Sequence, residues 1–83
     1  MSERLEDWIK FSTNVCTHIE DYTVPQYGDK GEDQISDYTA DDCVKQIKKY
    51  LARFGKNARE GQEKLDLLKI AHYVQLAYDK LEG

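Results

Sequence analysis

Three stretches of the sequence place apolar residues at alternating three- and four-residue steps, and this spacing constrains the fold more than any other feature. Residues at these steps lie on one side of an α-helix, so each stretch predicts a helix with one apolar face. The stretches cover about residues 3–24, 40–54 and 58–81. The sequence therefore predicts an all-α domain of three helices, with a long loop at residues 25–38 between the first two.

The first predicted helix carries a mainly apolar stripe and meets a proline at its end. The stripe contains Leu5, Trp8, Ile9, Ser12, Val15, Cys16, Ile19 and Tyr22. Because a proline disfavours helical geometry in the residue before it, Pro25 predicts that the helix ends near Val24. Residues 25–38 then show no helical period and contain two glycines and four acidic residues. We expect this segment to be a functional or mobile loop.

The second predicted helix has clear signals at both ends. Thr39 suits the N-terminal cap, Asp42 completes a capping box, and Gly55 suits the C-terminal cap. One face carries Cys43, Val44, Ile47, Tyr50, Leu51 and Phe54, and the opposite face carries Lys45, Lys48, Lys49 and Arg53. This pattern is typical of a helix that packs on one side and meets water on the other.

The third predicted helix is apolar around much of its circumference. Asn57 and Glu60 mark its start, near residue 58. One stripe contains Leu67, Ile70, Val74, Ala77 and Leu81, and a neighbouring one contains Leu65, Leu68, His72 and Leu76. Such a helix contacts two neighbours, so it is either the centre of the three-helix arrangement or the seam of a homodimer. Its short connection to the second helix predicts an antiparallel hairpin.

Composition limits the class of protein. Eighty-three residues form one domain with a small core, which makes self-association a reasonable expectation. No apolar run approaches the roughly 20 residues needed to cross a membrane. The acidic N-terminus lacks the features of a signal peptide, so we expect a cytoplasmic protein. Cys16 and Cys43 both fall within apolar stripes, which predicts two buried thiols and no disulfide.

The net charge of −4 conceals an uneven distribution. Residues 1–42 contain eleven acidic and three basic residues, a balance of −8, and residues 43–83 contain five acidic and nine basic ones, a balance of +4. The two halves therefore carry opposite charge, which influences the choice of partner more than the fold.

A basic cluster lies where the second and third predicted helices meet. Lys49 and Arg53 are four residues apart on one helical face, and Lys56, Asn57 and Arg59 follow. The free backbone N–H groups at the start of the next helix suit an anion. Together these groups predict a phosphate-binding site at the turn.

A structural interpretation of the same residues is also open. The basic side chains would complement the negative C-terminal pole of their own helix. Arg53 would pair with Asp66 across the hairpin, a contact that stabilises little at the surface. The cluster as a whole favours anion binding.

The same region resembles a family of small bacteriophage proteins. The resemblance lies in Lys-Tyr-Leu-x-Arg-x-Gly-Lys at residues 49–56, Asp-Leu-x-Lys at residues 66–69 and an aromatic residue four positions later, and it covers about residues 46–78. Most members have no assigned function, and some are labelled nucleotide kinases although they lack a Walker phosphate loop. The resemblance implies a phage or prophage setting and a nucleotide-linked role. It also implies the site residues Lys49, Tyr50, Arg53, Gly55, Lys56, Asp66, Lys69 and Tyr73.

Further polar residues near the end of the first helix form a second candidate site. His18, Gln26, Tyr27 and Asp29 could contact a ligand there, although an ordinary solvated turn explains them as well. His18, like His72, is flanked by apolar positions, and this setting favours a satisfied core histidine.

Three acidic residues raise the question of a metal site. Glu60, Glu63 and Asp66 stand at three-residue steps and could collect Mg²⁺ through oxygen ligands. A solvated helix face is the simpler interpretation, so we expect no metal and no cofactor.

The sequence favours a binding module that engages a phosphate-bearing ligand, either a nucleotide or a nucleic acid, at the turn between the second and third helices. One alternative is a protein-interaction or inhibitory module that binds a host protein through the acidic N-terminal half. Another is an enzyme of nucleotide metabolism. The sequence points to no catalytic residue.

Overall fold

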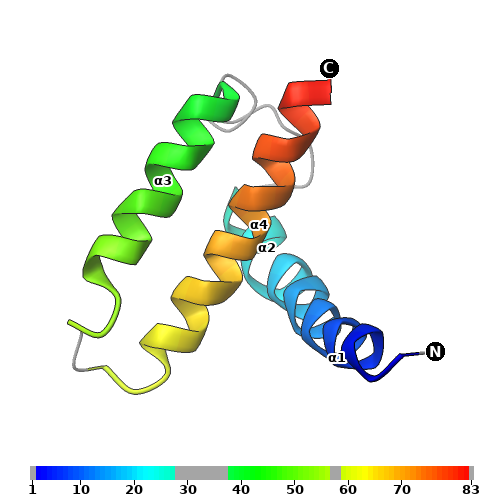
Figure 1. The fold of residues 1–83 in the computed structure, drawn as a ribbon. Helices are drawn as coiled ribbons and strands as arrows, with labels where there is room; N and C mark the ends of the chain where they lie inside the picture. The colour runs from blue at the N-terminus through cyan, green and yellow to red at the C-terminus, as the bar shows by residue number, and fades with distance from the viewer. Residues whose placement is uncertain (1, 28–37, 57–58, 83) are drawn as a thin grey trace.

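The computed structural model of the chain describes residues 2–27, 38–56 and 59–82. Within these ranges the chain forms α1 (Glu3–His18), η1 (Ile19–Thr23), α2 (Val24–Tyr27), α3 (Ala40–Arg53) and α4 (Gln62–Glu82), and no strand. Because α1, η1 and α2 follow one another without a break, they form one helical segment (Figure 1). The predicted all-α domain of three helices is confirmed.

The first helical segment begins as the sequence predicts but continues past its expected end. The Leu5 N–H donates to Ser2 Oγ over 3.1 Å, which caps α1. The prediction that Pro25 ends the helix near Val24 is wrong, since the segment runs to Tyr27. In the wider π-turn of η1, the Val24 N–H donates to the carbonyl of Ile19, five residues back. This wider turn relieves the clash between the proline ring and the preceding turn.

The predicted boundaries of α3 agree with the structure. The Asp42 N–H donates to Thr39 Oγ1, and the Thr39 N–H donates to the Asp42 carboxylate, so the capping box is complete. The hydrogen bond from the Thr39 backbone lowers the pKa of Asp42. After α3, Phe54 (φ −60°, ψ 131°) and Gly55 (φ 78°) form a type II turn in which the Lys56 N–H donates to the Arg53 carbonyl.

The start of α4 differs from the prediction. The helix begins at Gln62 and not near residue 58, and Glu60 lies in a turn. Gly61 has a φ of 80°, which no residue within a right-handed helix adopts, so helical geometry cannot extend through it. Asn57, the predicted cap, lies outside the described residues.

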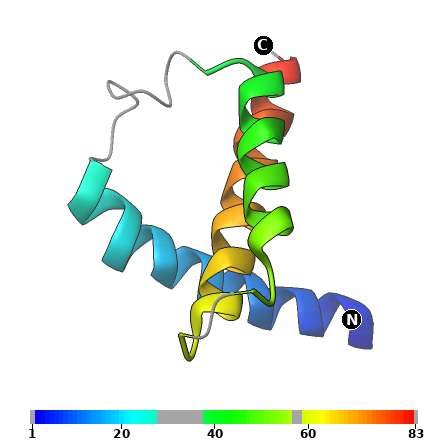
Figure 2. The same ribbon diagram turned by 90° about the vertical axis from the view of Figure 1, so that its left-hand side faces the viewer.

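The three segments form an open arrangement with α4 at its centre. α3 and α4 pack antiparallel, as predicted, and α1 crosses α4 at a wide angle (Figures 1 and 2). α4 therefore contacts two neighbours, as its broad apolar surface predicts. No helix in the described part of the chain is both long and apolar enough to cross a membrane.

The hydrophobic core is small. Among the described residues, only Cys43 and Ala77 are buried apolar residues, and both lie in the α3–α4 hairpin. Burial raises the pKa of the Cys43 thiol, as expected for a core cysteine. The prediction that Cys16 is also buried is wrong, because its thiol on α1 is exposed.

Candidate functional site

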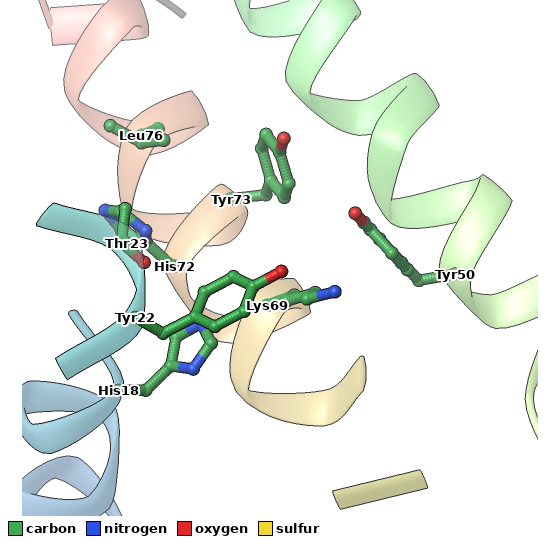
Figure 3. Close-up of a pocket in the computed structure, with 8 residues that line it drawn as sticks. All are labelled: His18, Tyr22, Thr23, Tyr50, Lys69, His72, Tyr73 and Leu76. Carbon is green, nitrogen blue, oxygen red and sulfur yellow. The ribbon is translucent and has the colours of Figure 1, made fainter. Parts of the chain in front are cut away.

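A small cleft of about 40 Å³ lies where η1 and the end of α1 approach the α3–α4 hairpin (Figure 3). Its lining consists of His18, Tyr22, Thr23, Tyr50, Lys69, His72, Tyr73 and Leu76. The cleft brings together four predicted site residues from three different helices, namely His18, Tyr50, Lys69 and Tyr73. We call it the Lys69 cleft.

Lys69 supplies the positive charge of the cleft. Its Nζ lies 5.3 Å from the ring centroid of Tyr22 and 5.5 Å from that of Tyr50, so the ammonium group reaches between two aromatic faces (Figure 3). Among the described residues, no carboxylate forms an ion pair with this ammonium group. The cation therefore lies against two ring faces, and its charge also acts on the nearby Asp66 carboxylate, whose pKa it helps to lower.

Two imidazoles line the same cleft. The His18 ring is buried and stacks on Tyr22, with centroids 5.1 Å apart. Burial lowers the pKa of His18, and the charges of Lys69 and His72 lower it further. Burial also lowers the pKa of His72. Both shifts start from an ordinary pKa near 6.5, so both imidazoles are mainly neutral at pH 7 and each retains one N–H donor.

Tyr50 connects the cleft to the basic turn. Besides Lys69, the Arg53 guanidinium lies 4.7 Å and Lys49 Nζ lies 5.7 Å from its ring centroid. The ring of Tyr73 stacks near it, at 6.1 Å between centroids. Three basic side chains therefore gather around one aromatic ring on this side of the hairpin.

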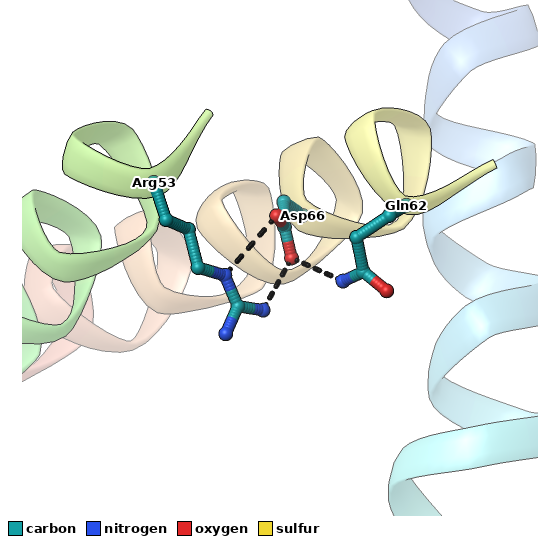
Figure 4. A network of polar contacts seen from close by, with 3 residues as sticks. All are labelled: Arg53, Gln62 and Asp66. Atoms are coloured by element: carbon teal, nitrogen blue, oxygen red, sulfur yellow. Dashed lines mark hydrogen bonds and ion pairs between the residues drawn. The ribbon is translucent and has the colours of Figure 1, made fainter. Parts of the chain in front are cut away.

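Arg53 is engaged in a polar network with a buried acid (Figure 4). Its Nη2 donates to Asp66 Oδ1 over 2.7 Å and its Nε donates to Oδ2 over 3.2 Å. Gln62 Nε2 donates to the same Oδ1 over 2.8 Å. The hydrogen bonds from Arg53 hold the pKa of Asp66 below its usual value, and the same contact raises the pKa of Arg53.

The pairing of Arg53 with Asp66 was the structural interpretation of the basic cluster, and it is confirmed. The contact is not the weak surface pair that the sequence suggested, because Asp66 is only 1% exposed. Arg53 therefore holds the hairpin together, and two of its five guanidinium N–H groups donate to Asp66.

The described part of the remaining turn site lies at the surface. Lys49, Lys56 and Arg59 are exposed, and Asn57 lies outside the described residues. Because α4 begins only at Gln62, its first N–H groups stand further along the chain than the turn site requires. A phosphate site at the turn stays a prediction.

The structure does not bring the residues of the second candidate site together. His18 lies in the Lys69 cleft, whereas Gln26 is exposed in α2. The side chain of Tyr27 and all of Asp29 lie outside the described residues.

The three acidic residues considered as an alternative magnesium site do not form a cluster. Asp66 bonds to Arg53 and Gln62, and Glu60 and Glu63 are exposed. The part of the chain that the structure describes contains no group of three His, Cys, Asp or Glu side chains placed to hold a metal ion.

Sequence reasoning missed the contribution of His72, Tyr22 and Leu76 to a shared site. The sequence did contain a signal for this site. One face of α4 carries Lys69 and, three, four and seven residues later, His72, Tyr73 and Leu76. His18 and Tyr22 similarly stand four apart. Interpreting both helix faces as apolar core leaves the polar atoms of His18, Tyr22 and His72 unassigned to any site.

Comparisons with known proteins add no relative. No protein-family model matches the chain, and no curated protein or solved structure gives a significant match. The resemblance to small phage proteins therefore stays a hypothesis from the sequence.

Proposed function

We propose that the protein binds a phosphate-bearing ligand, a nucleotide or a nucleic acid, with the phosphate in the Lys69 cleft. The observation that supports this most directly is the half-buried Lys69, whose ammonium group lies against aromatic rings in a cleft with two imidazoles and forms no ion pair with a described acid. A cation in such a place attracts an anion more strongly than one in open water.

The size of the cleft limits which part of the ligand enters it. A volume of about 40 Å³ suits a group as small as a phosphate, and not a base with its sugar. The rest of the ligand would lie outside, near the exposed Lys49. Contact with a lysine is a common way to hold the backbone of a nucleotide.

The proposal moves the phosphate away from the turn between α3 and α4. Arg53, the centre of the turn site, already bonds to Asp66, whereas Lys69 has no such acid among the described residues. Arg53 and Lys69 are both among the site residues that the resemblance to phage proteins implies. A nucleotide-linked role is therefore compatible with a phosphate at the turn or in the Lys69 cleft.

Calorimetric titration of inorganic phosphate, ATP and short single-stranded DNA into the full chain tests the proposal. Lys69→Gln removes the cation, and we expect at least about a tenfold loss of affinity. The control is Lys48→Gln, which makes the same charge change at an exposed position on α3. Absence of saturable binding, or an equal loss in both variants, would overturn the proposal.

A second candidate function is a protein-interaction or inhibitory module, and the first turns of α1 favour it. Leu5, Trp8 and Ile9 are exposed there because α1 extends past α4 (Figure 2). They stand beside Glu3, Glu6 and Asp7. An apolar stripe with acidic neighbours suits a basic groove on a host protein.

Capture from a host lysate with the wild-type chain and with Trp8→Glu separates this candidate from the first. We expect a specific protein that binds the wild type and not the variant. Recovery of the same proteins by both would count against it. An enzyme of nucleotide metabolism stays an untested prediction, which Mg²⁺-dependent turnover lost in Lys69→Gln would support.

A further inference from the structure

One face of the α3–α4 hairpin, on the side away from the Lys69 cleft, carries exposed apolar residues. It consists of Val44 and Leu51 on α3 and Val74, Tyr78 and Leu81 on α4, with exposed fractions between 39% and 79%. Val44 and Leu51 are seven residues apart, as are Val74 and Leu81, so each pair follows one side of its helix. The exposed Leu67 does not belong to this face, because it lines a groove with residues of α1 and η1. We call this surface the open hairpin face.

Helix geometry places the two stripes on the same side. Successive residues of an α-helix turn by about 100°, so three consecutive residues point in three directions. On α4, His72 faces the cleft beside η1, Tyr73 faces α3, and Val74 points one further step away from both neighbours. On α3, Tyr50 faces α4, and the next residue, Leu51, points to the side away from the cleft. In Figure 1, α2 passes behind α4.

The apolar core of the hairpin is small for two helices of this length. The described residues bury only Cys43 and Ala77 as apolar core, so a partner surface would supply much of the missing core.

We infer that a second copy of this chain covers the open hairpin face. Two hairpins packed through this face around a two-fold axis form a four-helix bundle, which is a closed and self-complementary arrangement. The helix charges support it, since α3 carries four basic and two acidic residues and α4 carries three basic and four acidic ones. The bundle places α3 of one copy beside α4 of the other, so helices of opposite net charge become neighbours.

The dimer does not depend on the proposed ligand. The Lys69 cleft opens on the side of the hairpin that faces η1, away from the open hairpin face. Each copy would therefore keep an accessible cleft, and the two proposals can fail separately.

Sedimentation equilibrium of the full chain over a hundredfold range of concentration tests the inference. We expect a dimer for the wild type and a monomer for Val74→Glu and for Leu51→Glu, because each places two acids in the seam. The control is Leu5→Glu, a matched change at an apolar residue of α1 that is 46% exposed, and we expect it to stay dimeric.

Far-ultraviolet circular dichroism reports whether each variant keeps its helices. Val74→Ser, a milder change, should keep them and weaken the dimer by at least about tenfold, because two buried valines are lost. A wild type that stays monomeric at the highest concentration would overturn the inference. So would dissociation by Leu5→Glu with no effect of Val74→Glu, because the seam would then lie on α1.

Discussion

Asp66 is the residue on which the geometry of the hairpin depends most. A carboxylate that is 1% exposed has lost nearly all its water, and burying it without partners would be strongly unfavourable. Three hydrogen bonds, two from Arg53 and one from Gln62, replace that water. Since Arg53 ends α3 and Gln62 begins α4, the network fixes how the two helices meet. Arg53, the arginine of the motif at residues 49–56, therefore has a structural role.

Replacing the buried acid should destabilise the fold. Asp66→Asn removes the charge that Arg53 faces, and we expect the free energy of unfolding to fall by about 1–3 kcal/mol in urea titration. Glu63→Gln, an exposed change on the same helix, should alter it by less than about 0.5 kcal/mol. The pKa of Asp66 is lowered in the folded state, so its contribution is present above about pH 4 and is lost as the pH falls further. The difference between wild type and Asp66→Asn should then close in acid, and equal stability at pH 7 would contradict the network.

His18 and His72 make a pH-dependent prediction for the Lys69 cleft. Both have lowered pKa values, so the unfolded chain takes up protons first as the pH falls below about 7, and stability should decrease from pH 7 to pH 5. A bound anion would reverse this preference by stabilising the charged imidazoles. Sulfate is the suitable probe because its charge is constant over this range. Its affinity should rise on acidification, by up to about tenfold per pH unit for each proton taken up, and the slope should be smaller in His18→Gln. An affinity independent of pH would contradict the placement of the anion.

At the scale of the elements, the turn after α3 depends on one glycine. Gly55 has a φ of 78°, and a side chain there would meet no atom within 4 Å, so the backbone alone decides the cost of substitution. Gly55→Ala should lower the free energy of unfolding by about 1–2 kcal/mol. Gly55→Asn is the matched comparison, and it should cost less because asparagine tolerates this conformation better. If thermal unfolding shows the two variants to be equal, the turn has another geometry.

The elements also show what the sequence could and could not predict. The limits of α3 followed from Thr39, Asp42 and Gly55, because caps act through local hydrogen bonds. The continuation past Pro25 could not be predicted, since it depends on a π-turn that no local pattern specifies. The cleft was only partly predictable for a different reason: its residues come from three helices, and a single sequence does not show which faces meet.

At the scale of the whole molecule, the protein is a hairpin with one covered side and one open side. α1 crosses the covered side and forms the cleft there, and its own N-terminal turns extend into solvent (Figure 2). The exposed stripe on α1 and the open hairpin face are thus two separate apolar surfaces. A dimer through the hairpin leaves the α1 stripe available, so self-association and binding to a host protein do not exclude each other.

Trp8 distinguishes the two apolar surfaces in solution. It is the single tryptophan of the chain, it is 58% exposed, and it lies on α1 and not on the open hairpin face. We expect acrylamide to quench its fluorescence equally at concentrations below and above the dimerisation range, because the hairpin seam does not cover α1. Binding of a host protein to the α1 stripe should reduce the quenching and shift the emission to shorter wavelength. Quenching that decreases with protein concentration alone would place α1 in the seam between two copies, and the free surface would then be the hairpin.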